Sequence, residues 1–268
     1  MIVSRRALLA AVAAVVAKAA PADKREGSVV TNPADDQVFE LRQYTLRRGR
    51  RDVLIALFEE RFIEPQNALG AHIIGTFRDL DDPDRFVWIR SFRDMRSRQL
   101  ALSAFYDGPV WRANRTVANA TMLDSNNVLL LRPAEPGAGF RSRPAAPGGP
   151  PGVIGATIYY LGGVDALQFT RYFEETLMPQ LSREGVDPLA RLVSEEGPNT
   201  YTRLPIRERD RAFVWLARWP DAAAEEICLS KLGTLSGWRD SAPEAVLPAL
   251  MRKPERLRLT PTMRSPLR

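Results

Sequence analysis

The amino-acid sequence predicts an α+β fold made of two tandem ferredoxin-like (βαββαβ) units. Two observations carry this prediction. The stretch RFVWIRSF at Arg85–Phe92 returns as AFVWLARW at Ala212–Trp219, and further short matches follow in the same order through both halves of the chain. Ordered matches of this kind indicate an internal duplication. Both repeated strands are also apolar on both faces, so each face needs a cover.

The first half opens with a strand, a helix and a hairpin. Phe39–Leu46 is rich in residues that favour strands. Residues 50–64 are predicted as a helix because large apolar side chains recur every fourth position, and Pro65 then closes or kinks it. Ala71–Phe77 and Arg85–Phe92 form two strands joined by an aspartate-rich turn.

The rest of the first half completes one βαββαβ unit. Asp94 is a suitable cap for a second helix, which runs to about Tyr106. The helix breaks at Asp107-Gly108 and restarts with Pro109 in its first turn. Asn127–Leu131 is the fourth strand, and the resulting order is that of the ferredoxin-like split unit.

The second half repeats this order. Asp165 and Gln168 form a capping-box-like helix start, and Pro220-Asp221 starts the second helix. The strands are expected at Val153–Leu161, Leu189–Glu195, Arg211–Trp219 and Glu255–Leu259. Helices cover one face of each sheet. The remaining face is most simply covered by the sheet of the other copy. Sheet on sheet gives an α+β barrel, which could close within one chain or across a dimer.

The segment between the two copies is a predicted linker, because eleven of the twenty residues from 133 to 152 are Pro or Gly. The expected organisation is therefore an export signal and disordered leader at 1–37, a first unit at 38–132, the linker at 133–152, a second unit at 153–262 and a tail at 263–268.

The N-terminus has the pattern of an export signal. Ser4-Arg5-Arg6 precedes the apolar run Ala7–Ala17, and small residues suited to cleavage follow. The pattern resembles a twin-arginine signal and predicts a periplasmic protein, with a cytoplasmic protein as the alternative. No other apolar run approaches transmembrane length. The formal net charge is +6, but the arginines are scattered among carboxylates, so nucleic-acid binding has no specific support.

Four segments resemble the NIPSNAP family: ELRQYTLRRGR, PQNALGAHIIGTF, RFVWIRSF and DGPVWRAN. The resemblance covers about residues 38–262. It implies the dimeric α+β-barrel architecture, a homo-oligomer, and no agreed catalytic chemistry. Related barrels include cofactor-independent monooxygenases and haem-handling enzymes, so by analogy of fold a ligand pocket is expected.

His72 is the only histidine and is expected to share a strand face with Ile74 and Thr76. It could act as a general base or an axial haem ligand, or simply pack in a strand. Tyr44 and Tyr159 occupy matching places on the first strand of each unit. Charged groups on buried strands are costly unless they are paired or used. The candidate lining of a pocket is therefore Arg42, Tyr44, His72, Trp88, Arg90, Tyr159 and Trp215; a salt-bridge network inside the barrel would explain the charged members equally well.

Other site chemistries lack a motif. The turn with Asp79, Asp81, Asp82 and Asp84 has no glycine or distal glutamate for calcium, and the lone Cys228 sits at an apolar helical spacing typical of a buried thiol. No nucleotide, zinc or serine-hydrolase motif occurs, so we expect no metal and no cofactor.

Two functions follow as hypotheses. The first is a protein that binds a small apolar ligand or serves as an assembly module. The alternative is a monooxygenase-like or haem-handling oxidoreductase acting on a small aromatic substrate, with His72 and Tyr44 handling protons. A single enclosed space reached by both residues would favour the enzyme.

Overall fold

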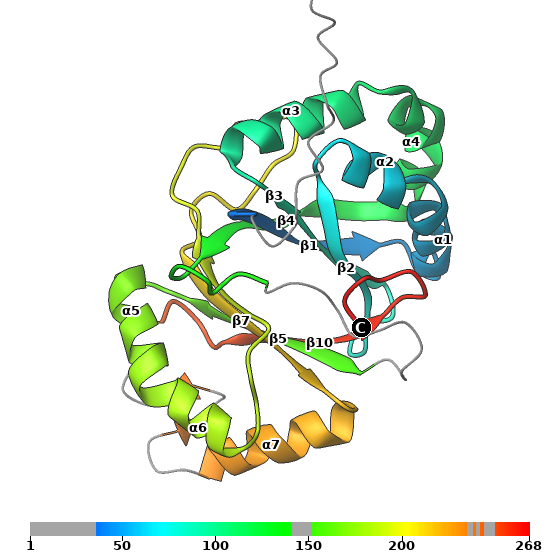
Figure 1. Cartoon of the computed structure of the whole chain (residues 1–268). Helices are drawn as coiled ribbons and strands as arrows, with labels where there is room; N and C mark the ends of the chain where they lie inside the picture. The colour runs from blue at the N-terminus through cyan, green and yellow to red at the C-terminus, as the bar shows by residue number, and fades with distance from the viewer. Residues whose placement is uncertain (1–35, 141–151, 235–237, 240–241, 244–249) are drawn as a thin grey trace, which may run out of the picture. The chain divides into compact units, whose positions relative to one another are not determined.

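The computed structural model describes residues 36–140, 152–234, 238–239, 242–243 and 250–268 (Figure 1). The export signal predicted at the N-terminus lies outside them. The first half contains β1 (Val38–Leu46), α1 (Arg51–Arg61), α2 (Ile63–Ala68), β2 (His72–Asp79), β3 (Arg85–Phe92), α3 (Met95–Tyr106), α4 (Pro109–Thr121) and β4 (Met122–Pro133). The second half contains β5 (Val153–Tyr160), α5 (Ala166–Tyr172), the π-helix η2 (Phe173–Leu177), α6 (Met178–Arg183), β6 (Ala190–Ser194), β7 (Ala212–Trp219), α7 (Ala222–Thr234), β8 (Trp238–Arg239), β9 (Ala242–Pro243) and β10 (Glu255–Pro261).

Eight strands form a closed antiparallel barrel in the order β1-β3-β2-β10-β5-β7-β6-β4. The first half supplies β4-β1-β3-β2 and the second half supplies β10-β5-β7-β6, which is the same order of equivalent strands. Two seams join the halves: β2 pairs with β10, and β4 pairs with β6. The predicted mixed α+β fold is thus confirmed, and the barrel closes within one chain.

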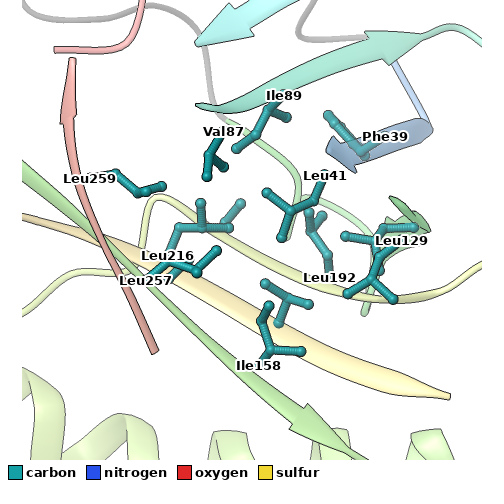
Figure 2. Packing of buried hydrophobic residues seen from close by; sticks show 14 of the residues in the cluster. Phe39, Leu41, Val87, Ile89, Leu129, Ile158, Leu192, Leu216, Leu257 and Leu259 are labelled. Carbon is teal, nitrogen blue, oxygen red and sulfur yellow. The ribbon is translucent and has the colours of Figure 1, made fainter. Parts of the chain in front are cut away.

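The barrel interior is filled by one apolar cluster. Val87 and Ile89 of β3 lie in it with Val214 and Leu216 of β7, while their neighbours Phe86 and Trp88 belong to another cluster. Successive side chains of a strand point to opposite faces, so this partition is the one expected for strands apolar on both faces. Figure 2 shows side chains from β1, β3 and β4 meeting those of β5, β7 and β10 across the interior. Full burial of a Val, Leu, Ile or Phe side chain stabilises the fold by about 1.5–3 kcal/mol.

Helices cover the outer faces of the two halves separately. Helices α1–α4 pack on the outer face of β1 and β3, where Phe58 contacts Trp88. Helices α5–α7 pack on β5 and β7 around Phe173 and Trp215. The predicted caps are present: Asp94 accepts a hydrogen bond from the backbone N–H of Ser97, and Asp165 accepts from those of Leu167 and Gln168.

Both ends of the described chain pack more closely than the sequence indicated. Asp36, expected in a disordered leader, is buried and bonds to Ser91 Oγ. Residues 263–268, expected as a tail, contribute Leu267 to the barrel core, and its backbone N–H donates to the carbonyl of Ile74. The C-terminal contacts follow because β2 extends beyond its pairing with β10, and the C-terminal residues satisfy its backbone groups there.

Candidate functional site

The seven residues predicted to line one pocket lie in three separate places. Arg42, Tyr44, Trp88 and Arg90 come together on the outer face of β1 and β3, beneath helices α1–α4. Tyr159 and Trp215 occupy the equivalent positions of the second half, beneath α5–α7.

His72 lies apart from the other candidates because β2 carries a bulge. The register shifts between Ile73 and Gly75, so that His72 pairs with Ser91 whereas Thr76 pairs with Trp88. Ser91 and Trp88 lie on opposite faces of β3, and the expectation that His72 and Thr76 share a face is therefore wrong. His72 is bonded through Nδ1 to Asp36 Oδ2 at 2.7 Å.

His72 is also distant from Tyr44. In the register of β1 and β3, the row of His72 passes through Phe39, five residues before Tyr44. At about 3.3 Å per residue this corresponds to roughly 16 Å along the sheet. The two residues proposed as joint proton-handling groups therefore do not face one space.

The charged residues on the outer face of the first half form a buried ionic group, here called the Glu40 cluster: Glu40, Arg42, Arg90 and Arg98. None of the four side chains is more than 1% exposed. Glu40 Oε2 accepts hydrogen bonds from Arg42 Nη1 and Arg90 Nε, both at 2.7 Å, and Oε1 accepts from Arg98 Nε at 2.6 Å. One carboxylate thus binds three guanidinium groups.

Neutral partners, among them Tyr44, Gln66 and Asn199, extend this cluster. Arg42 Nε donates to the hydroxyl of Tyr44 at 3.1 Å, and Arg90 Nη1 donates to Gln66 Oε1 at 2.8 Å. Arg98 Nη1 donates to Asn199 Oδ1 at 3.0 Å, in the connection between β6 and β7. The cluster therefore ties β1, β3, α2 and α3 to a loop of the other half.

The charges in the cluster fix the protonation states around it. Burial alone would raise the pKa of Glu40, but attraction to Arg90, Arg42 and Arg98 outweighs it and holds that pKa well below its usual value of 4.5. Burial lowers the pKa of Arg98, against the opposing effect of Glu40. Burial raises the pKa of Tyr44, so its hydroxyl keeps its proton at neutral pH.

The second half has no such cluster at the matching positions. In the strand register Gly155 stands where the first half has Glu40, Thr157 where it has Arg42, and Ala217 where it has Arg90. A Cβ on Gly155 would lie 2.5 Å from the ring of Trp219, so no side chain fits there. Among the described residues, the second half therefore has no carboxylate bound by three arginines at these positions, and the buried carboxylate nearest Gly155 is Glu225, which pairs with Arg256.

A small cavity lies directly above the Glu40 cluster, between the sheet and helices α1–α4. We call it the helix–sheet cavity. Its volume is about 30 Å³, and its walls are mostly aromatic, including Phe58, Phe62 and Trp111. We call Tyr44, Gln66 and Trp88, the lining residues that contact arginines of the Glu40 cluster, its floor. Glu40, Gln66 and Arg98 were not among the predicted site residues, although Glu40 shares its strand face with Arg42 and Tyr44.

A second pocket, of about 500 Å³, opens near the start of α3 and the end of β4. Its charged lining combines Asp94, Glu135 and Glu195 with Arg132. Among the described residues no helix is long and apolar enough to cross a membrane. In the same part of the chain, no three His, Cys, Asp or Glu side chains are grouped to hold a metal ion.

Replacing Glu40 with glutamine should destabilise the protein severely. Glu40→Gln leaves three buried guanidinium groups without a carboxylate, and breaking a buried ion pair in this way costs about 3–5 kcal/mol. Urea unfolding followed by circular dichroism measures the change. The control is Glu135→Gln, which removes a half-exposed partner of Arg191 and should cost about 1 kcal/mol or less. Equal costs for the two variants would contradict a central role for Glu40.

Stability should depend on pH through the same carboxylate. Because the pKa of Glu40 is lowered on folding, its contribution is complete above about pH 4.5 and is lost as the pH falls below that value. The gap in unfolding free energy between wild type and Glu40→Gln should therefore stay constant near neutrality. Below pH 4.5 it should shrink by about 1.4 kcal/mol per unit. Titration of the other carboxylates affects both proteins alike and cancels in this difference. A difference in unfolding free energy that persists unchanged to pH 3 would contradict the assignment.

Comparison with known proteins bears on the first half most directly, since residues 39–136 match the family model described as NIPSNAP. No curated protein matches the chain. A NIPSNAP family protein of unknown function from Agrobacterium tumefaciens aligns with 37% of this chain and 89% of its own at 19% identity, with a TM-score of 0.34.

Two solved structures align with most of the chain, and both are named as proposed monooxygenases. The one from Lactobacillus acidophilus covers 84% of this chain and 94% of its own at 13% identity, with a TM-score of 0.52. The one from Fusobacterium nucleatum covers 84% and 92% at 8% identity, with a TM-score of 0.54. At such identities the likeness establishes the fold alone. The part of this chain that is similar to the NIPSNAP family model is residues 39–136.

Proposed function

We propose that the protein binds a small, planar, largely apolar molecule in the helix–sheet cavity of its NIPSNAP unit. The observation that carries the proposal is the cavity's composition: aromatic walls above a floor with three polar side chains. Ligand sites are characteristically apolar with a few placed polar groups that fix orientation.

The floor of the cavity has hydrogen-bonding capacity to spare. Nε1 of Trp88 is buried and has no hydrogen-bond partner among the described residues. The Tyr44 hydroxyl accepts a bond from Arg42 Nε, which leaves its own proton for another acceptor. Buried polar groups without partners are costly, so a ligand that satisfied them would be stabilised there.

The cavity must widen to take a ring. A volume of about 30 Å³ holds little more than a water molecule, whereas ligand sites usually exceed about 300 Å³. Helix α4 is suited to such a movement, because only Ala118 and Thr121 of its residues are buried. Tyr106 and Trp111, at the junction of α3 and α4, are only half-buried and contact each other edge to face.

A second candidate is oxidation of a small aromatic molecule in the same cavity. It is favoured by the names of the two structures that share the fold over most of this chain. In this account Tyr44 remains a proton-handling group, but His72 lies too far along the sheet to join it. The haem-handling form of this candidate loses the axial ligand expected for it, because His72 is the only histidine of the chain and lies too far along the sheet to reach the cavity.

The remaining parts of the proposal rest on the sequence. The two halves arose by duplication of a ferredoxin-like unit, the protein assembles as a homo-oligomer, and the N-terminal segment exports it to the periplasm. The equivalent strand order of the halves supports the first of these.

Binding can be tested with 1-naphthol, a small neutral aromatic probe, by titration followed through tryptophan fluorescence. Wild type should bind it, and Ala118→Leu should weaken binding at least tenfold, because the added carbons fill the cavity that Ala118 lines. The matched control is Ala113→Leu on the exposed side of the same helix, which should bind like wild type.

A second variant, Trp88→Phe, keeps the apolar floor while removing one donor, and should weaken binding by about fivefold. Its control is Trp215→Phe at the equivalent position of the second half. Binding unaffected by Ala118→Leu and Trp88→Phe would place the probe elsewhere and overturn the proposal. Oxygen uptake with the bound probe would support the oxidative candidate.

A further inference from the structure

The Glu40 cluster carries more positive than negative charge. Three guanidinium groups surround one carboxylate, and every side chain in the cluster is at most 1% exposed. The other partners are neutral: Tyr44, Gln66, Asn199 and Thr200. Two buried positive charges are thus left without a counter-charge among the contacts of the described residues, and uncompensated buried charge is strongly unfavourable.

The donors of the cluster are also incompletely used. Nη2 of Arg98 is buried without a hydrogen-bond partner in the described part of the chain. Nη2 of Arg90 lies 2.7 Å from Glu40 Oε2 without the alignment of a hydrogen bond. Both observations indicate a site with more donors than the protein's own acceptors can satisfy.

The cluster reaches the helix–sheet cavity through the residues of the cavity floor. Tyr44 is bonded to Arg42, and Gln66 is bonded to Arg90. The guanidinium carbons of Arg42 and Arg90 lie 5.3 Å and 5.0 Å from the ring centroid of Trp88. A ligand atom on the Tyr44 hydroxyl would therefore be about 6 Å from the Arg42 guanidinium, in a poorly screened environment.

Each floor residue has a donor group to spare. Arginine has no acceptor, so the bond from Arg90 must go to the amide oxygen of Gln66 and orients that oxygen toward the cluster. The –NH₂ group of Gln66 donates one N–H to the carbonyl of Phe62 and has the other to spare. Tyr44 uses its oxygen on Arg42 and has its proton to donate, and indole nitrogen is always a donor. The positive charge of the arginines favours a negative group, and the donors of the floor favour a group rich in acceptors. Both conditions are met by the same kind of ligand group.

We propose that the ligand of the helix–sheet cavity is an aromatic carboxylate, with its ring against the aromatic walls and its carboxylate on Tyr44, Gln66 and Trp88. This inference rests on the function proposed above and names the class of molecule that the cavity takes. Arg42 and Arg90 act behind the floor as positioning residues that supply the charge. Binding would bring the net charge of the cluster and ligand from +2 to +1.

The test compares two probes of nearly equal shape, 2-naphthoate and 2-naphthamide, by isothermal titration at pH 7 with the full chain. Wild type should bind the carboxylate at least tenfold more tightly than the amide. Arg42→Met should reduce that preference to about threefold or less. The control, Arg256→Met, removes an arginine paired with Glu225 in the second half and should keep the wild-type preference.

Arg90→Met serves as a second variant if Arg42→Met does not fold, with the same expected loss of preference. The preference should persist in 0.5 M NaCl, because a buried site is poorly screened, whereas a surface site for anions would lose it. Equal binding of the two probes, both weakened by Ala118→Leu, would overturn the carboxylate assignment and leave the cavity proposal intact. If neither probe binds, both the carboxylate assignment and the cavity proposal are overturned. A preference that Arg42→Met and Arg90→Met leave unchanged would also overturn the assignment.

Discussion

The structure depends on one constraint: the central strands of each half are apolar on both faces, and each face must be removed from water. The inner faces of β3 and β7 meet across a closed barrel, and the outer faces are covered by separate helix layers. A four-stranded sheet with helices on one side would leave the inner residues exposed. The seams between β2 and β10 and between β4 and β6 solve this within a single chain.

The two halves use this common frame differently. In the second half Gly155 leaves its place to the ring of Trp219 and to the carboxylate of Glu225, which pairs with Arg256. In the first half Glu40 gathers three arginines. A buried ionic cluster contributes little net stability compared with apolar packing of the same volume. The excess of arginines over carboxylates in the first half is therefore better explained by a role at the adjoining cavity than by the needs of the fold.

Much of the fold was predictable because its signals are local. The alternation in RFVWIRSF assigned Val87 and Trp88 to opposite faces, and Asp94 and Asp165 marked helix starts correctly. The placement of His72 was not predictable, because a bulge at Ile73–Gly75 breaks the alternation without a sequence signal. Tyr44 and Arg42 were assigned to one face, and the same alternation would have included Glu40.

The partners that complete the site could not be found in this way. Arg98 and Gln66 come from helices whose positions over the sheet depend on tertiary packing. Asn199, which binds Arg98, lies 101 residues away in a connection of irregular structure. Contacts between elements so distant along the chain have no periodic signature, and only the closed barrel brings them together.

The most direct test of this account is a cross-link at the seam between the halves. Arg78 of β2 and Thr260 of β10 are paired in register, and Cys replacements at both should form a disulfide in a Cys228→Ser background. If the barrel closes within one chain, oxidation of dilute protein gives an intrachain bond whose yield is independent of protein concentration. Disulfide-linked dimers formed in proportion to protein concentration, with no intrachain product, would show that the seam joins two chains and would contradict the account.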